Sequence, residues 1–248
     1  MNTITSRPFR YRLRSLIYHT PLRTLFAKLR QALRQPPAHE DSGWWDNALK
    51  SEKSSYLGEA ASIGLREAII GELLCQFQIT PRAILDMGCG GGTLCRSLAQ
   101  FKPETYTGVD ISRYAIERNI STDANGKNGH GMAISFVESS LQTYAPPNGV
   151  VFDVIAFNEV LYYLDVHEAC QQVKRYCQHL DHNGVIAVTM KDDPKSHAIF
   201  RKLTREFDWV GGTLFQECGS QPHFRIKMNE KSPAYVIGLL RPKSLPQS

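Results

Sequence analysis

The sequence predicts an α/β fold: a doubly wound, mostly parallel sheet of seven strands that ends in an antiparallel β-hairpin. Three observations support this prediction. Short apolar segments of strand length alternate along the chain with amphipathic helical segments, as in parallel sheets with crossover helices. A glycine-rich turn follows the first of these strands, and two strand-like segments near the C-terminus are joined by a short polar turn.

Each predicted strand is a short run of apolar residues bounded by a turn or by a helix start. The predicted strands are residues 83–87, 106–109, 134–137, 150–157 and 185–190, and then the hairpin of residues 223–228 and 235–240. Helices are predicted where apolar residues recur every three or four positions. The clearest one follows the capping residue Asp165 and includes Leu180, and another begins at Asp193-Pro194 and includes Phe207. Other predicted helices include residues 69–77, 94–101 and 112–119.

The first 40 residues differ in composition from the rest of the chain. Residues 1–35 hold seven arginines, one lysine and no acidic residue, although the formal net charge of the whole chain is only +5. Leucine and phenylalanine recur at helical spacing over residues 22–33, after the helix-start signal Thr20-Pro21. We therefore predict a basic amphipathic helical extension with a linker in residues 1–40. A globular domain is predicted over residues 41–248, and its residues 41–80 are an N-terminal helical region.

Such a basic helix has several interpretations, and the sequence does not decide between them. It can dock on its own domain, lie on an anionic membrane surface, or serve as an organelle transit peptide. Arginines interrupt every apolar stretch of residues 1–35, so a secretory signal is not predicted. No run of about 18 apolar residues predicts a membrane span. We expect a cytoplasmic protein, with peripheral contact to the inner face of the membrane as an open alternative.

The six cysteines are irregularly spaced and form no Cys-x-x-Cys pair. This spacing argues against a zinc site and against a disulfide framework, and it is typical of a reducing compartment. We therefore expect no metal. The sequence gives no indication of the oligomeric state.

The turn after the first strand is the predicted ligand site. It reads Asp86-Met87-Gly88-Cys89-Gly90-Gly91-Gly92, and its glycines allow the backbone to approach a ligand closely. Asp110 ends the second strand, where a carboxylate can accept hydrogen bonds from both hydroxyls of a ribose. Thr93 stands where the dinucleotide fingerprint requires a third glycine. The turn therefore suits a nucleoside without a pyrophosphate.

Together with Gly108-Val109-Asp110-Ile111-Ser112, this turn resembles the class I S-adenosylmethionine-dependent methyltransferases, over roughly residues 43–241. The resemblance implies a Rossmann-like fold and S-adenosylmethionine as the cofactor, with S-adenosylhomocysteine as the product. It also implies that the glycine loop passes under the methionine and ribose of the cofactor, that Asp110 binds the ribose, and that Ile111 packs on the adenine. Residues 41–80 would include a lid over the cofactor.

Two further cofactor contacts are implied by this resemblance. The family often carries an acidic residue after the third strand, but Ser139 and Ser140 stand there, so a hydroxyl or a backbone group would contact the adenine amine. Asn158, at the end of the fourth strand, would lie beside the methionine moiety. The implied cofactor-binding residues are Asp86, Gly88, Cys89, Gly90, Gly92, Asp110, Ile111, Ser139, Ser140 and Asn158.

The acceptor of the methyl group is less defined by the sequence. Asn158 is followed by Glu159-Val160 and not by the Pro-Pro of adenine and many RNA methyltransferases, which argues against a nucleic-acid acceptor. Residues 159–164 resemble sugar N-methyltransferases of the nodulation-factor type and related small-molecule enzymes. We therefore expect in-line transfer of the methyl group to an oxygen or nitrogen of a small-molecule or glycan-intermediate acceptor. Since a hydroxyl acceptor needs a base, the candidate catalytic residues are Glu159, Tyr163 and His167.

Other functions stay open at this point. A nicotinamide-dependent reductase is disfavoured by Thr93 and by the lack of a Tyr-x-x-x-Lys pair. An RNA- or protein-directed methyltransferase could use the basic extension to bind its substrate. A cofactor-binding partner subunit without activity would carry the same motifs, because these motifs bind the cofactor and do not show turnover.

Overall fold

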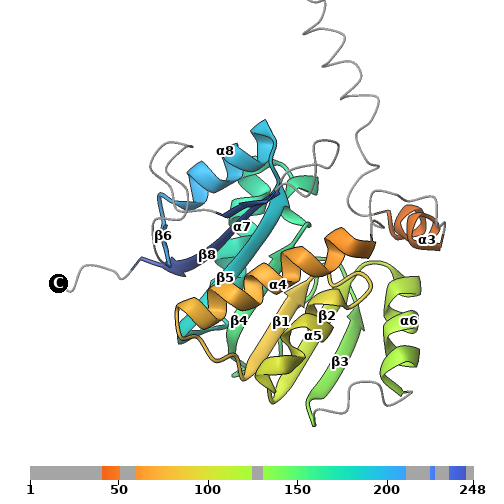
Figure 1. The fold of residues 1–248 in the computed structure, drawn as a ribbon. Helices are drawn as coiled ribbons and strands as arrows, with labels where there is room; N and C mark the ends of the chain where they lie inside the picture. The colour runs from red at the N-terminus through yellow and green to blue at the C-terminus, as the bar shows by residue number, and fades with distance from the viewer. Residues whose placement is uncertain (1–40, 51–59, 125–130, 211–223, 227–234, 244–248) are drawn as a thin grey trace, which may run out of the picture. The chain divides into compact units, whose positions relative to one another are not determined.

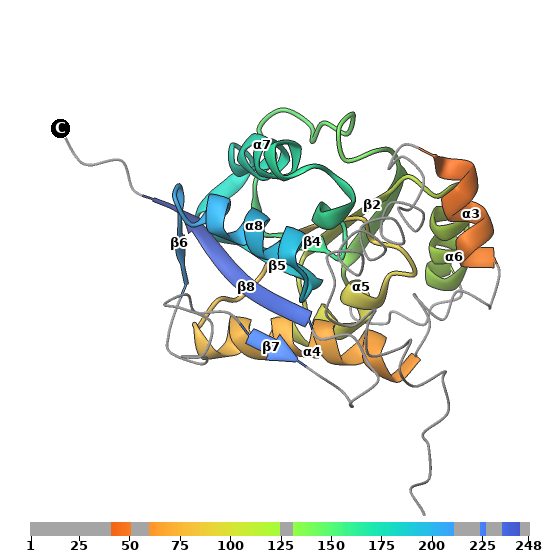
Figure 2. The same ribbon diagram turned by 90° about the horizontal axis from the view of Figure 1, so that it is seen from above.

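A single twisted sheet runs through the domain, with helices on both of its faces (Figures 1 and 2). The computed structural model describes residues 41–50, 60–124, 131–210, 224–226 and 235–243, all within one unit, His39–Ser248. The predicted basic extension, residues 1–40, lies outside the described residues. Its boundary with the domain and its three interpretations therefore stay predictions. Within the described ranges, no helix has the length and apolar character needed to cross a bilayer.

The elements alternate along the chain in the predicted manner. The strands are β1 (Ala83–Met87), β2 (Thr105–Asp110), β3 (Ala133–Glu138), β4 (Phe152–Asn158), β5 (Leu180–Lys191), β6 (Phe207–Trp209), β7 (Phe224–Ile226) and β8 (Tyr235–Pro242). The helices are α3 (Ser42–Lys50), α4 (Ala60–Gln76), α5 (Thr93–Leu98), α6 (Arg113–Ala124), α7 (Val166–Cys177) and α8 (Pro194–Leu203), with short 3-10 turns η1 (Ala99–Phe101) and η2 (Leu161–Tyr163).

The strand order is β3-β2-β1-β4-β5-β8-β6, with β7 also paired to β8. The first five strands are parallel, whereas β8 is antiparallel to β5, β6 and β7. The predicted doubly wound sheet and its antiparallel end are thus confirmed. Two short strands, β6 and β7, share the outer edge of β8, where the prediction had a single strand. The order reverses between β1 and β4, and ligands of such sheets bind beyond the strand ends at this reversal.

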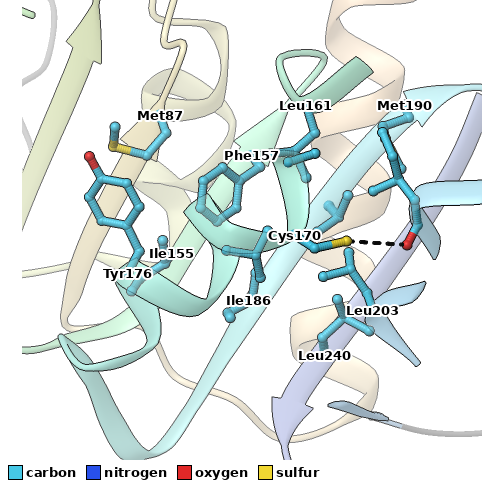
Figure 3. Close-up of a cluster of buried hydrophobic side chains, with 14 of the residues drawn as sticks. Met87, Ile155, Phe157, Leu161, Cys170, Tyr176, Ile186, Met190, Leu203 and Leu240 are labelled. Carbon is cyan, nitrogen blue, oxygen red and sulfur yellow. Dashed lines mark hydrogen bonds between the residues drawn. The ribbon is translucent and has the colours of Figure 1, made fainter. Parts of the chain in front are cut away.

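Each face of the sheet is covered by its own hydrophobic cluster. The cluster under α7 and α8 includes Met87, Phe157, Cys170 and Tyr176, and Figure 3 shows these side chains packed between the sheet and the helices. A second cluster lies under α4 and α5 and contains residues of the opposite strand face. Because side chains alternate along a strand, the neighbours of Met87 and Phe157 at the strand ends point to the α4 face. Asp86 and Asn158 therefore point toward α4.

Two predicted helix ends are wrong. Leu180 begins β5, because α7 ends at Cys177 and the chain turns into the sheet beside Phe152. Phe207 begins β6, because α8 ends at Leu203 and Phe207 pairs with Pro242 of β8. In both cases an apolar residue happened to continue the helical spacing, and no glycine or proline marked the end of the helix.

Candidate functional site

The glycine loop has the backbone conformation that its sequence predicts. Gly88, Gly90 and Gly92 have φ values of 79°, 46° and 68°, in the left-handed region that favours glycine. A Cβ on Gly88 would also meet the Val160 side chain at 3.0 Å, so this position is closed to larger residues. The loop folds back on the second strand, because the amides of Gly88 and Cys89 donate to the carbonyl of Val109 at 2.7 and 3.0 Å.

Asp110 ties this loop to the end of β2. Its Oδ2 accepts a hydrogen bond from the Gly90 amide at 2.8 Å, and its Oδ1 accepts one from the Ser112 amide at 2.8 Å. Burial raises the pKa of Asp110 above its ordinary value, and these two backbone donors oppose the shift. Each carboxylate oxygen can accept more than one hydrogen bond, so Asp110 can bind two ligand hydroxyls while it still holds the loop.

Asp86 lies one residue before Met87 and is buried on the α4 face of the sheet. Its Oδ2 accepts a hydrogen bond from the Tyr106 hydroxyl at 2.5 Å, whereas Oδ1 accepts none from the described residues. Burial raises the pKa of Asp86 to about 7, and the neighbouring Glu67 and Asp110 add to the shift. Asp86 thus presents a buried oxygen that lacks a donor.

Asn158 and Glu67 join the end of β4 to α4. The Asn158 side-chain amide donates to Glu67 Oε1 at 2.8 Å, and the Glu67 side chain is only 1% exposed. Burial raises the pKa of Glu67. Within the described part of the chain, Asn158 Oδ1 and Glu67 Oε2 have no hydrogen-bond partner. Together with Asp86 they form a buried group of acceptor oxygens under α4.

Glu159 follows Asn158 and has φ 61°, a left-handed conformation that is rare for glutamate. Its amide donates to the Thr189 carbonyl at 2.9 Å, and its Oε2 accepts from the Tyr162 hydroxyl at 3.1 Å. Arg66 of α4 lies 3.5 Å from the same oxygen. Burial raises the pKa of Glu159 to about 7, although Arg66 opposes the shift. This carboxyl can therefore exchange a proton near neutral pH.

The other predicted cofactor residues lie at the ends of β2 and β3. Ile111 directly follows Asp110 and is half-buried. The Ser139 amide donates to the Asp110 carbonyl at 2.9 Å, and the hydroxyls of Ser139 and Ser140 pair with the Thr143 hydroxyl at 3.1 and 2.8 Å. These residues lie at the carboxyl ends of β2 and β3, beside Asp110, and their contacts with the adenine stay predictions.

The three predicted catalytic residues do not all lie together. Tyr163 is next to Glu159, since its hydroxyl is 3.3 Å from that of Tyr162, and burial raises its pKa to about 12. His167 is exposed in the first turn of α7, and its Nδ1 is 2.9 Å from Lys202 Nζ on α8. Glu159 and Tyr163 thus belong to the buried polar group, whereas His167 contacts a lysine of another helix.

The comparisons with known proteins agree with this arrangement. A profile of the family described as "Methyltransferase domain" matches residues 63–225, which include the glycine loop, Asp110 and Glu159. The chain belongs to the class I S-adenosylmethionine-dependent methyltransferases.

Individual members of this class are similar over part of the chain. Trans-aconitate 2-methyltransferase of Rhodopseudomonas palustris is 32% identical over 146 residues, which cover 56% of this chain and 51% of that protein. Ubiquinone biosynthesis O-methyltransferase of Rickettsia prowazekii is 25% identical over 67% of this chain and 62% of that protein. The chain spans about half the length of the trans-aconitate enzymes that it matches.

A solved methyltransferase structure has the same fold. Magnesium protoporphyrin IX methyltransferase of Synechocystis, solved with bound S-adenosylmethionine, superposes with a TM-score of 0.58 at 16% identity. The match covers 81% of this chain and 97% of that chain.

The described residues of this methyltransferase fit its cofactor. Asp86, Asn158 and Glu67 each contribute a buried oxygen without a donor, and Arg66 contributes a buried donor, Nε, without an acceptor. Buried polar atoms of this kind call for a ligand that supplies the missing partners. The amino-acid end of S-adenosylmethionine has an ammonium with three donors and a carboxylate. Among the described residues, no group of three histidine, cysteine, aspartate or glutamate side chains is arranged to hold a metal ion.

The sequence did not single out Arg66 and Glu67. They lie on α4, upstream of the motifs. They contact Glu159 and Asn158 only because α4 packs on the sheet. A signal is nevertheless present, because Glu67 shares a helix face with the buried Ile70 and Leu74. A charged residue on an apolar helix face is a candidate functional residue, since its burial requires a partner.

Proposed function

We propose that the protein transfers the methyl group of S-adenosylmethionine to an oxygen of a small-molecule acceptor, with Glu159 as the group that receives the acceptor's proton. The observation that carries this proposal is the buried Glu159 carboxyl, which follows the predicted cofactor-binding residue Asn158 and has an oxygen, Oε1, without a donor in the described chain. A base acts best when its pKa lies near the working pH, and burial brings the pKa of Glu159 to about 7.

The chain's own residues hold this base in position. The left-handed backbone at Glu159 is fixed by its amide bond to Thr189, and Arg66 and Tyr162 hold Oε2. Oε1 is left to accept a proton from the acceptor. Arg66 also favours the ionised carboxylate, which is the form that can act as a base.

Positioning is the other contribution of the site. The cofactor supplies a methyl group bonded to a positively charged sulfur, and the neutral thioether of S-adenosylhomocysteine is an excellent leaving group when this bond breaks. The protein has to align the acceptor oxygen with this methyl group, and such alignment can contribute about 7–11 kcal/mol. Asp110 and the glycine loop would hold the nucleoside end of the cofactor, and Asn158 and Glu67 would hold its methionine end.

Several finer expectations remain proposals. One similar protein is named an O-methyltransferase, which supports an oxygen acceptor. The proposed base at Glu159 also favours a hydroxyl acceptor over an amine. A sugar hydroxyl is compatible with this chemistry, whereas the resemblance of residues 159–164 to sugar N-methyltransferases would favour a sugar amine. Membrane contact through residues 1–35 would suit a lipid-linked glycan intermediate.

Incubation of the full chain with methyl-labelled S-adenosylmethionine tests the proposal. The acceptor probes are 3,4-dihydroxybenzoate for a phenol, trans-aconitate for a carboxylate and UDP-glucosamine for a sugar. We expect label in a hydroxyl acceptor, with a large loss in Glu159→Gln. The control Glu72→Gln removes an exposed carboxylate from α4 and should transfer label normally. If S-adenosylhomocysteine binds but none of the probes is labelled, the partner-subunit interpretation is favoured instead.

A further inference from the structure

A buried amide side chain connects α6 to the glycine loop. Asn119 of α6 is only 5% exposed, and its Nδ2 donates a hydrogen bond to the Gly90 carbonyl at 2.7 Å. The sequence did not single out Asn119, which lies 29 positions after Gly90 and outside the motifs. Buried polar side chains are paired as a rule, and the partner here is the loop on which the cofactor is expected to lie.

Gly90 is held by a side chain on each of its two peptide groups. Its amide belongs to the preceding peptide group and donates to Asp110 Oδ2 at 2.8 Å, whereas its carbonyl belongs to the next group and accepts from Asn119. Since each peptide group is planar, these two bonds together fix both backbone torsions of Gly90, including its left-handed φ of 46°. Glycine has the greatest backbone freedom of all residues, so such a restraint changes its conformational range the most.

The loop is held by helices on one side and open on the other. A Cβ on Gly92 would meet Asn119 Oδ1 at 3.2 Å and Arg96 Nη1 at 3.5 Å. The same Arg96 nitrogen, on α5, donates to the Gly91 carbonyl at 2.8 Å, so α5 and α6 hold two consecutive carbonyls. A Cβ on Gly90 or Gly91, by contrast, would meet no atom of the described residues within 4 Å. A ligand can therefore approach the loop at these two residues.

We propose that Asn119 is a positioning residue for the cofactor: it fixes Gly90, and through Gly90 it orients the Asp110 carboxylate for the ribose. Asp110 is oriented by two amides, that of Gly90 on Oδ2 and that of Ser112 on Oδ1. When Gly90 is free to turn, Oδ2 loses its fixed donor and the carboxylate can rotate. The inference rests on the proposed function, since it requires a nucleoside cofactor at Asp110.

Calorimetric titration of S-adenosylhomocysteine into the full chain tests the effect on affinity. Asn119→Ala should bind about three- to ten-fold more weakly, the range that corresponds to loss of one hydrogen bond. Asn119→Leu keeps the size and branching of the side chain beside Gly92 but has no donor. It should show the same loss, in a variant whose packing is preserved.

Glu117→Ala is the matched control on the same helix. The Glu117 side chain is 62% exposed, and its Oε1 accepts from Arg113, also of α6, at 2.8 Å. This substitution changes α6 without removing a hydrogen bond to the glycine loop. Glu117→Ala should therefore bind S-adenosylhomocysteine like the wild type.

A second ligand separates positioning from a purely structural role. 2′-Deoxy-S-adenosylhomocysteine lacks one of the two hydroxyls that Asp110 is proposed to bind, so the wild type should prefer the ribose ligand. In both Asn119 variants this preference should fall by about three-fold or more, because a misplaced carboxylate gains little from the hydroxyl. A general weakening of the domain would instead lower both affinities equally and leave the preference unchanged.

The other outcomes overturn the inference in distinguishable ways. Wild-type affinity in both Asn119 variants, an unchanged preference for the ribose ligand, or an equal loss in Glu117→Ala would show that Asn119 does not position Asp110. A wild type that binds the two ligands equally would contradict the role of Asp110 at the 2′-hydroxyl, while cofactor binding would stand. If the wild type binds neither ligand, the proposed function itself fails.

Discussion

Replacement of Asp86 by asparagine should stabilise the protein at alkaline pH, because the fold buries this carboxyl with few partners. Asp86 is 1% exposed, and its side chain accepts a hydrogen bond from Tyr106. Burial raises its pKa from 3.8 to about 7. The folded protein therefore holds a proton that the unfolded chain has lost over this interval. The free energy of unfolding should accordingly fall as the pH rises from about 4 to about 7.

The size of this effect follows from the pKa shift. A shift of about three units, at about 1.36 kcal/mol per unit, corresponds to about 4 kcal/mol of stability lost by pH 8. Relaxation of the site and entry of water reduce this value, so we expect about 2–4 kcal/mol. Asparagine is neutral at every pH, and its side-chain oxygen can still accept the hydrogen bond from Tyr106. The variant should therefore not show this loss.

Urea unfolding of the wild type and of Asp86→Asn at pH 5 and pH 8 measures the difference. At pH 5 the variant should be the more stable protein by only about 1 kcal/mol, since about a third of the interval between the two pKa values has then been crossed. At pH 8 the variant should be the more stable protein. Equal pH dependence in the two proteins would show that Asp86 is not buried as an unpaired carboxyl, and the account of the polar group under α4 would be wrong.

Other substitutions test the base and the packing of the sheet. Glu159→Gln should lower the turnover of a hydroxyl acceptor by about a hundred-fold or more, as loss of a general base does; a comparable loss in His167→Gln with none in Glu159→Gln would move the base to His167. Gly238→Ala places a Cβ against the ring of Trp209 and should lower the free energy of unfolding by about 1–3 kcal/mol in urea titrations. Gly64→Ala on α4 meets no atom within 4 Å and should instead raise it by about 0.5–1 kcal/mol; a loss of stability there would contradict the helical environment.

Local features of the site could be predicted from the sequence. The glycine loop requires positive φ angles, which glycine adopts more readily than other residues. Its conformation could therefore be predicted from the residue type alone. Asp110 follows a short apolar strand, and parallel strands place their carboxyl ends at one edge. Both features depend on neighbours within a few residues. The positions of Asp86, Asp110 and Asn158 at adjacent strand ends follow from the strand order, which the βαβ pattern restricts to few choices.

Contacts between distant segments could not be predicted in this way. Glu67 meets Asn158 91 positions later in the chain, and Asp46 meets Ser112 66 positions later. Such contacts depend on how α3 and α4 lie on the sheet, which a single sequence without aligned relatives does not define. The strand at Phe207 was missed for a different reason, since three residues are too few to show an alternating pattern.

Calorimetric titration of S-adenosylhomocysteine into Asp110→Ala and Asp153→Ala tests the central claim most directly. Both aspartates accept two backbone amide hydrogen bonds. Asp153, however, accepts those of Arg82 and Ala83 at the N-terminal ends of β4 and β1, whereas Asp110 lies at the carboxyl end of β2. Asp153→Ala should bind like the wild type. Asp110→Ala should bind roughly a hundred-fold more weakly, because two hydrogen bonds to a charged acceptor are lost. Equal affinities in the two variants would contradict the assignment of Asp110 to the ribose.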